Sequence, residues 1–177
     1  MFDLINQAGF FLLKSFAEFL SILLLMRFFM QLFRVSFANQ IGAFVVQLTN
    51  WLVLPLRKVV PGVFGLNLSS LLPAYLLQVL VLFAAVALQA GPEIPVVAIL
   101  FDGLRALLRT GIYLLIGLLI LQAVLSWVNP YSPISRPINQ ITQIFLGPIQ
   151  RVVPPIANVD LSPLVAILLA QVVLIFI

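Results

Sequence analysis

A seven-residue motif occurs twice in this chain, and this repetition constrains the possible folds more than any other feature. Residues 55–61 read PLRKVVP and residues 148–154 read PIQRVVP, so the two copies are offset by 93 positions (148 − 55 = 93). The same offset, without a gap, places Gln78 on Gln171. A fixed offset held over many positions indicates an internal duplication, so we predict two copies of one structural unit. The turn-forming and basic residues of the two motifs are Pro55, Arg57, Lys58, Pro61, Pro148, Arg151 and Pro154.

The composition indicates a lipid environment. Hydrophobic residues make up 63% of the chain and charged residues 8%, whereas soluble domains contain about 45–50% and about 25%. Four apolar stretches approach the roughly 20 residues that are needed to cross a bilayer. They are residues 16–33, 69–90, 110–128 and 162–177, of which the last is short. We predict an all-α membrane protein with four transmembrane helices.

The residue types that are missing exclude most catalytic and metal chemistry. The chain contains no cysteine and no histidine, which removes thiolate catalysis, cysteine metal sites, the commonest general base and haem ligation by either residue. The acidic residues are dispersed, and neither a phosphate-binding loop nor a nucleophile elbow is present. We predict a non-enzymatic protein without a metal or cofactor. Its scattered arginines do not form the basic face that nucleic-acid binding needs.

The duplication also predicts how the chain is divided and oriented. We assign residues 1–90 to the first repeat, 91–109 to a linker with an amphipathic helix, and 110–177 to the second repeat. A unit with two spans begins and ends on the same side of the membrane, so its duplicate inserts in the same orientation. The expected fold is a pair of tandem, parallel helical hairpins.

The basic residues favour one orientation of these hairpins, because the positive-inside rule counts lysine and arginine close to the spans. The two inter-span loops carry Arg34, Arg57, Lys58, Arg136 and Arg151, and the opposite side carries Lys14, Arg105 and Arg109. This contrast favours inter-span loops in the cytoplasm and both termini outside.

Each inter-span loop contains a segment with apolar residues at helical spacing and amides on the other side. These segments are residues 37–52 and 134–145. Such short helices lie at the membrane interface or enter it as re-entrant pieces. The prolines at positions 55 and 148 are predicted to end them. The residues expected to cap the returning spans are Asn67, Ser69, Asp160 and Ser162.

Three polar residues are predicted to share one face of the first span. Arg27, Gln31 and Arg34 are spaced i, i+4 and i+7. An arginine at mid-bilayer costs about 2.5–3.5 kcal/mol, and less where it snorkels to the interface. Two interpretations stay open: a polar stripe that contacts another helix, an ion path or a partner, and a snorkelling arginine. Lys14 and Glu18, at i and i+4, are expected to pair near the outer surface.

Two glutamines occupy equivalent mid-span positions, Gln78 in one repeat and Gln171 in the other. Interhelical hydrogen bonds of such amides contribute roughly 0.6–2 kcal/mol in lipid. Pseudo-symmetry allows both amides to face a shared axis, where they would serve helix packing or coordinate a solute or ion. Gln122 of the third span is a candidate for the same network.

Several motifs resemble the YggT family of small membrane proteins, also called YlmG. They are residues 125–130 (LSWVNP), 154–155 (PP), 160–164 (DLSPL) and 55–62 (PLRKVVPG), and the resemblance covers nearly the whole chain. It implies a bacterial inner-membrane protein, similar to plastid proteins, with links to osmotic-stress tolerance, cell division or nucleoid organisation, and cytochrome complex maturation. The chain departs from the family pattern at Gln122, where arginine is frequent, and at Asn50 and Gln143, where an acidic residue is frequent.

Two functions of different classes are consistent with these features. The first is an accessory or assembly factor that docks other membrane proteins in the osmotic-stress response, cell division or the biogenesis of membrane complexes. The second is an oligomeric channel or a component of solute or potassium transport, because four spans are too few to enclose a pore alone. Its polar lining would consist of Arg27, Gln31, Gln78, Gln122 and Gln171. Both functions involve the lipid bilayer together with other membrane proteins or further copies of the chain.

Overall fold

All the regular secondary structure in the described part of the chain is α-helical. A computed structural model describes residues 2–59, 68–89, 95–129, 131–153 and 160–177. These residues form six α-helices and no strand. The helices are α1 (Phe2–Leu32), α2 (Gln40–Val59), α3 (Leu68–Gln89), α4 (Val96–Val128), α5 (Ser135–Gln150) and α6 (Ser162–Phe176).

Three of these helices, α1, α3 and α4, are long and apolar enough to cross a membrane. A helix satisfies its own backbone polar groups, as a segment surrounded by lipid must. Helix α6 is also apolar but has 15 residues, fewer than the roughly 20 of a typical span. Residues 96–109, predicted as part of a linker, are continuous with the third predicted span in the single helix α4. The chain is therefore an all-helical membrane protein with three candidate spans among its described residues.

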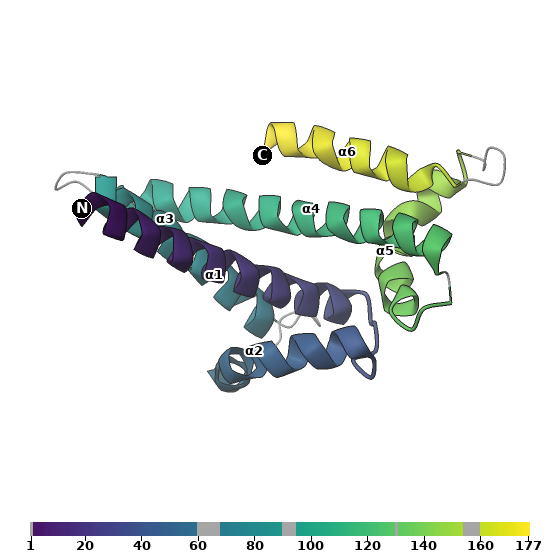
Figure 1. Ribbon diagram of the computed structural model, residues 1–177, viewed down its shortest axis with the longest axis horizontal. Coiled ribbons are helices and arrows are strands. Elements are labelled where there is room, and N and C mark those ends of the chain that lie inside the picture. The colour runs from purple at the N-terminus through teal and green to yellow at the C-terminus, as the bar shows by residue number, and fades with distance from the viewer. Residues whose placement is uncertain (1, 60–67, 90–94, 130, 154–159) are drawn as a thin grey trace.

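The long helices lie side by side (Figure 1). Helix α1 packs along α3, both pack against α4, and α4 lies between α6 and the α1–α3 pair. The N-terminus and the start of α4 lie at one end of the molecule, and the C-terminal ends of α1 and α4 lie toward the other, which we call the loop end. Helix α2 packs on α1 and α3, and α5 packs on α4 and α6. Each half thus places one shorter helix beside its longer ones.

The two halves contribute unequally to the buried core. One buried cluster near the loop end combines residues of α1, α2, α4 and α5, among them Met30, Val45 and Ile141. A second cluster joins α1, α2, α3 and α4. The third is smaller and joins α4, α5 and α6, to which α6 contributes a single buried residue, Ala166. The third helix of the first half is therefore held in the core, and the third helix of the second half lies at its margin.

Helix α1 ends in a Schellman motif. Arg34 has a φ of 54°, a left-handed conformation that favours glycine. The Val35 N–H donates to the Met30 carbonyl at 2.8 Å, and the Arg34 N–H donates to the Gln31 carbonyl at 3.2 Å. Val35 and Met30 are buried in one cluster, which supplies the hydrophobic contact of the motif. Arg34 therefore lies beyond the helix and is exposed, so the prediction that it shares a helical face with Arg27 is wrong.

The turn into α2 depends on an asparagine and a glycine. The Asn39 Oδ1 accepts a hydrogen bond from the Gly42 N–H at 2.8 Å, which caps the helix. A Cβ at Gly42 would lie 2.6 Å from the Phe37 Cα and 2.6 Å from the Phe37 carbonyl oxygen. The backbone of the preceding loop crosses directly over the first turn of α2, and glycine leaves the room that this approach needs.

Proline does not end α2 or α5, contrary to the prediction. Pro55 lies inside α2, which continues to Val59, and Pro148 lies inside α5, which continues to Gln150. A proline removes one backbone donor and crowds the preceding turn, but the residues after it still donate to carbonyls before it. Each proline is followed by about one further helical turn or less, so the disruption is confined to the end of the helix.

The basic residues of the repeated motif lie at the C-terminal ends of these two helices. Arg57 and Lys58 occupy the last turn of α2 and are exposed, and Arg151 follows α5 directly and is also exposed. Positive charge at a helix C-terminus is stabilised by the helix dipole. Pro61 and Pro154 lie outside the described residues.

Asp160, rather than Ser162, provides the cap of α6. The helix begins at Ser162, and the N–H of this residue donates to the Asp160 Oδ1 at 2.9 Å. Ser162 is wrong as the predicted cap because it already belongs to the first helical turn. Ser69, expected to cap α3, is the second residue of that helix and is buried. Asn67 lies outside the described residues.

Candidate functional site: a buried arginine and the polar groups between helices

Arg27 links α1 to α2 through hydrogen bonds. Its side chain is 6% exposed, and its Nη1 donates to the Thr49 Oγ1 at 2.8 Å and to the Asn50 Oδ1 at 3.0 Å. Thr49 is fully buried and donates in turn to the Val45 carbonyl at 2.6 Å. Hydrogen bonds to charged groups contribute about 1.5–3 kcal/mol, so these contacts position α2. Of the two interpretations that the sequence left open, the structure shows contact with another helix.

The charge of Arg27 has no counter-charge among the described residues. The ion pairs found there are Lys14–Glu18 at 3.7 Å, as predicted, and Asp102–Arg105 at 3.3 Å. The Arg27 Nε is buried without a hydrogen-bond partner in that part of the chain. A buried charge that is balanced by neutral oxygens alone is costly, and an ionisable residue inside a span is by default a candidate functional residue.

Two glutamines in the long helices have buried side-chain oxygens without partners in the described segments. They are Gln31, in the last turn of α1, and Gln122, which is half-buried in α4.

In the second half, Thr142 is fully buried and donates to the Ile138 carbonyl of its own helix at 2.9 Å, as Thr49 donates to the Val45 carbonyl. The second half therefore contains the buried threonine, but no hydrogen bond joins it to α4 within the described residues.

Gln78 is buried between α3 and α4. Its Nε2 lies 3.4 Å from the Thr110 Oγ1, at the long limit of a hydrogen bond, and Thr110 donates to the Ala106 carbonyl at 2.9 Å. Gln171, at the equivalent position of α6, is exposed and makes no hydrogen bond to a described residue. The two amides therefore share no hydrogen-bond network within one chain, and a polar lining built by several copies stays a prediction.

Thr49, which accepts the hydrogen bond from Arg27, and its counterpart Thr142 are buried residues whose structural role sequence reasoning missed. Thr49 and Thr142 are separated by the repeat offset (142 − 49 = 93), and both lie on the buried side of a shorter helix. A threonine inside a helix can donate its hydroxyl proton to the carbonyl four residues back. Its oxygen then faces outward as an acceptor. A repeated threonine within an apolar stripe is the signal that could have identified these positions.

A polar cleft of about 600 Å³ opens between the two inter-helix turns. One wall comes from residues 36–40 and the other from residues 131–140. Arg136 lies in the first turn of α5, is exposed, and forms no ion pair within the described residues. A cation is not stabilised by the dipole at a helix N-terminus, so positive potential gathers here beside amides and hydroxyls. The polar lining residues used below are Ser36, Asn39, Gln40, Ser132, Arg136 and Gln140.

A chain of amides ties α5 to the start of α6. The Gln143 Nε2 donates to the Gln150 Oε1 at 2.8 Å, and the Gln150 Nε2 donates to the Asp160 Oδ2 at 2.8 Å. Partial burial raises the pKa of the Asp160 carboxyl. The hydrogen bonds that it accepts from Ser162 and Gln150 together lower the pKa by more than burial raises it, so this pKa lies below its ordinary value. Asp160 is a charged capping group rather than a proton carrier at neutral pH.

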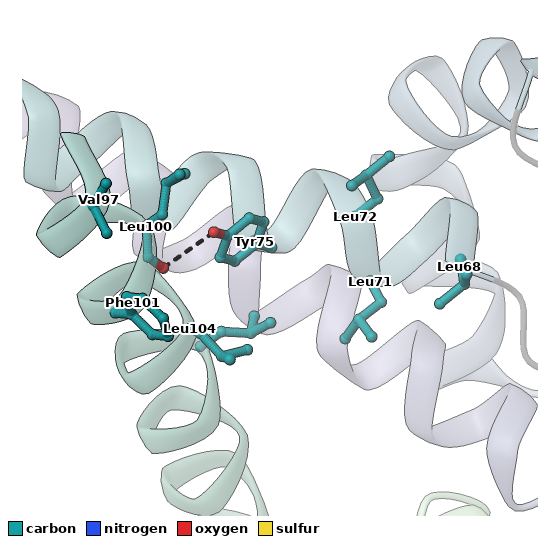
Figure 2. A pocket seen from close by; sticks show the side chains of 9 residues that line it. Leu68, Leu71, Leu72, Tyr75, Val97, Leu100, Phe101 and Leu104 are labelled. Carbon is teal, nitrogen blue, oxygen red and sulfur yellow. Dashed lines mark hydrogen bonds between the residues drawn. The ribbon is translucent and has the colours of Figure 1, made fainter.

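An apolar groove of about 470 Å³ runs between α3 and α4, with Tyr75, Val97 and Phe101 among its lining residues (Figure 2). The Tyr75 hydroxyl donates to the Leu100 carbonyl at 3.1 Å, the interaction drawn as a dashed line in Figure 2. The other residues that line the groove have apolar side chains. Because the one hydroxyl is already bonded, the groove offers carbon surface, as expected of a groove that faces lipid.

The fold and the site together define a class of protein. The described residues contain no group of His, Cys, Asp or Glu side chains placed to hold a metal ion. The buried polar residues that do have partners bond to neighbouring helices or to the carbonyls of their own helix. This is an all-helical membrane protein in which Arg27 and Gln78, inside candidate spans, form hydrogen bonds to neighbouring helices.

Comparison with known sequences identifies the family. The sequence model of the CCB3/YggT family matches residues 6–88 and 101–177, and the chain belongs to this family, as its motifs predict. The Escherichia coli K12 protein YggT, described as uncharacterized, is 35% identical over 167 residues, which cover 92% of this chain and 85% of the relative. An uncharacterized Vibrio alginolyticus protein is 32% identical over 157 residues (88% and 85%). A Pseudomonas aeruginosa protein is 30% identical over 167 residues (93% and 85%). No solved structure gives a significant match.

Proposed function

We propose that this chain is a non-enzymatic accessory or assembly factor of the bacterial inner membrane, which binds other membrane proteins at its loop end. The proposal rests on which polar side chains already form hydrogen bonds between helices. Arg27 and Gln78 bond to neighbouring helices, so they support the fold instead of lining a path through it. The polar cleft, by contrast, holds one exposed cation, Arg136, beside the amides of Gln40 and Gln140, none of which supports the packing of the spans.

The proposed architecture has four spans in two parallel repeats. The family model matches two segments of similar length, 6–88 and 101–177, and the order of long helix, shorter helix and apolar helix occurs twice. At about 1.5 Å per residue, the 15 residues of α6 extend about 22 Å, a length that local thinning of the bilayer accommodates.

In this architecture α2 and α5 lie at the cytoplasmic interface and both termini lie outside. Helix α2 exposes the large apolar side chains of Phe44, Leu48 and Trp51, and Gln47 is exposed beside them on the same face. A helix surface that combines a tryptophan and other large apolar side chains with polar ones suits the membrane–water interface. The polar cleft then faces the cytoplasm, where a partner protein can reach it.

The proposed role serves the osmotic-stress response, cell division or the biogenesis of membrane complexes, the processes that the family resemblance suggests. The unpaired Arg136 and its amide neighbours suit an acidic or polar segment of such a partner, because charge-assisted hydrogen bonds are the stronger ones.

A photo-crosslinking amino acid at Gln140, inside the cleft, tests the proposal in living cells. We expect protein adducts that disappear when Arg136→Glu reverses the charge of the cleft. The same adducts should persist in Arg151→Glu, because Arg151 is exposed but does not line the cleft. The crosslinker at Leu80, which is 50% exposed on a candidate span, is the control and should give no such adduct. Adducts that are missing at Gln140, or that survive Arg136→Glu, contradict the proposal.

The alternative is an oligomeric channel or a component of solute or potassium transport. Gln171 favours it, because an exposed amide in an apolar helix is a position that pore-lining groups occupy. Purified protein in liposomes, assayed for potassium flux with and without Gln171→Leu and Gln78→Leu, separates the two functions. Flux that Gln171→Leu abolishes favours the channel. The absence of flux, or flux that neither substitution changes, favours the accessory role.

A further inference from the structure

We infer that a second copy of this chain packs on α6, and that α1 of the second copy covers the face of α6 that contains Gln171. The inference rests on the repeat architecture proposed above, and it goes beyond the proposed function by naming both a partner and a surface. Its template is the contact between α3 and α4 within one chain.

Helices α3 and α4 approach closely where a glycine faces a valine. A Cβ on Gly103 would lie 2.6 Å from the Val79 Cγ2, so the two helices are in direct contact at this point. Leu107, one turn further along α4, is buried, and Gln78 of α3 reaches the Thr110 Oγ1 at 3.4 Å. The interface thus joins a small residue, a leucine and a hydroxyl on α4 to a valine and an amide on α3.

Helix α6 repeats the α3 side of this interface but leaves it uncovered. At the repeat offset of 93, Gln171 corresponds to Gln78 and Val172 corresponds to Val79. Gln78 is 7% exposed, whereas Gln171 is exposed without a hydrogen bond to any described residue, and Val172 is 49% exposed. An amide that faces lipid without a partner is unfavourable, so this face of α6 needs a polar partner.

Helix α1 repeats the α4 side and leaves it uncovered as well. Residues 13–15 (LKS) correspond to residues 108–110 (LRT) at an offset of 95 (108 − 13 = 95). This offset is two larger than 93 because the first half has two more residues between this segment and the repeated motif. The interface residues Gly103, Leu107 and Thr110 then correspond to Ala8, Leu12 and Ser15. Leu12 is 67% exposed although Leu107 is buried, and Ala8 and Ser15 are also exposed.

One chain does not bring its two uncovered faces together, because α4 separates α6 from α1 (Figure 1). Two copies satisfy both faces reciprocally, with α6 of each copy packed on α1 of the other. In this arrangement Val172 contacts Ala8, and the Gln171 amide donates to the Ser15 hydroxyl, as Gln78 does to Thr110 within the chain.

Disulfide crosslinking tests the contact directly, since the chain contains no cysteine of its own. Two differently tagged copies, one with Ala8→Cys and one with Val172→Cys, are co-expressed and oxidised in native membranes. We expect a mixed dimer that a reductant separates. It should be about tenfold more abundant than the dimer from Ala8→Cys with Leu164→Cys, because a disulfide needs Cα atoms within about 7 Å. Leu164 is a matched control, because it is 59% exposed on the same helix but lies about 12 Å from Val172 along α6.

A second measurement removes the amide alone. In the cysteine-free chain, Gln171→Leu should weaken dimerisation in detergent about eightfold, because the reciprocal dimer loses two interhelical amide bonds. A missing mixed dimer, equal crosslinking by the control pair, or an unchanged dimer dissociation constant overturns the inference. These results would leave the proposed function standing, since that is tested by adducts at Gln140. Loss of those adducts with an intact mixed dimer would overturn the proposed function alone.

Discussion

The two halves of this chain contain the same sequence pattern but bury it to different extents. In the first half, α3 is enclosed by α1 and α4, and Ala74 and Gln78 are both buried. In the second half, α6 buries Ser162 and Ala166 near its start and exposes most of the remaining helix. The same amide at the equivalent position is a packing residue in one half and an exposed group in the other. The comparison shows that the burial of a polar residue in an apolar helix depends on which helix packs over it.

The halves also fasten their shorter helices differently. Arg27 bonds to Thr49 and so joins α2 to the long helix that precedes it. In the second half, Gln150 bonds to Asp160 and so joins α5 to the helix that follows it. The first half therefore relies on a buried charge, and the second half on exposed amides near the surface of the molecule.

The largest expected difference between the halves is at the buried arginine. Arg27→Ala removes both hydrogen bonds to α2 and leaves a cavity, so the free energy of unfolding in mixed detergent micelles should fall by about 3 kcal/mol. Gln122→Ala, in the third predicted span, removes a side chain that makes no hydrogen bond to a described residue and should lower it by about 1 kcal/mol. Equal losses would contradict the asymmetry.

A substitution at the start of α2, in the first half, should destabilise the protein nearly as strongly as Arg27→Ala. Gly42→Ala forces a Cβ against the Phe37 backbone, so we expect a loss of about 2–3 kcal/mol in the same unfolding measurement. The equivalent position is Ser135 (135 − 42 = 93), whose Oγ donates to the Asn129 carbonyl at 3.3 Å. Ser135→Ala should cost about 1 kcal/mol. A stable Gly42→Ala variant would show that the loop does not cross α2 as described.

Substitutions at two glycines of α4 test the contact between the halves. Gly103→Ala brings a Cβ within 2.6 Å of the Val79 Cγ2, and valine is stiff at χ1, so α3 and α4 must separate. We expect a loss of about 1–3 kcal/mol in unfolding free energy. A Cβ at Gly117 would meet nothing within 4 Å, so Gly117→Ala is the control and should not destabilise the protein. Similar effects at both sites would argue against the close approach.

The paired glutamines give a smaller difference. Gln78→Leu removes a long interhelical hydrogen bond and should lower the unfolding free energy by about 0.6–1.7 kcal/mol. Gln171→Leu should leave the unfolding of the dissociated chain unchanged, because its amide has no partner among the described residues. Dilution in micelles before unfolding separates this effect from any effect on dimerisation. A destabilised Gln171→Leu monomer would place Gln171 inside the chain.

The smallest effect is expected at the cap of α6, and it depends on pH. The pKa of Asp160 is lowered in the folded chain, so its stabilisation is present at neutral pH and is lost as the pH falls through that folded-state pKa. Asp160→Asn should cost about 0.5 kcal/mol at neutral pH, a small value because solvent screens this group. Unfolding measured across acidic pH should show the variant and the unmodified chain converging. A constant difference would mean that the charge of Asp160 is irrelevant.

The sequence predicts the helices of this fold well because they follow from general physical properties. Apolar runs and helical spacing are averages over many residues, and tertiary contacts do not easily override them. The helices expected at residues 37–52 and 134–145 are found as α2 and α5, and long helices occur where three of the spans were expected. The pairing of Lys14 with Glu18 also follows from spacing alone.

The details that sequence reasoning got wrong depend on single contacts. Arg34 leaves the helical face because Val35 packs back on Met30 and ends α1. Pro55 stays inside α2 because a proline breaks one hydrogen bond, and the rest of that helix end is still supported. The exposure of Gln171 could not be read from its position either, since burial depends on which helix packs on it.

The central claim is that the two halves insert in the membrane in the same orientation. Lys58 and Arg151 occupy equivalent positions (151 − 58 = 93) and are both exposed. Single-cysteine variants at these positions, treated with a membrane-impermeant maleimide before and after the cells are opened, report the side of each. We predict that both cysteines are labelled only after opening. Labelling of one in intact cells and of the other only in opened cells would place the halves in opposite orientations and contradict the account.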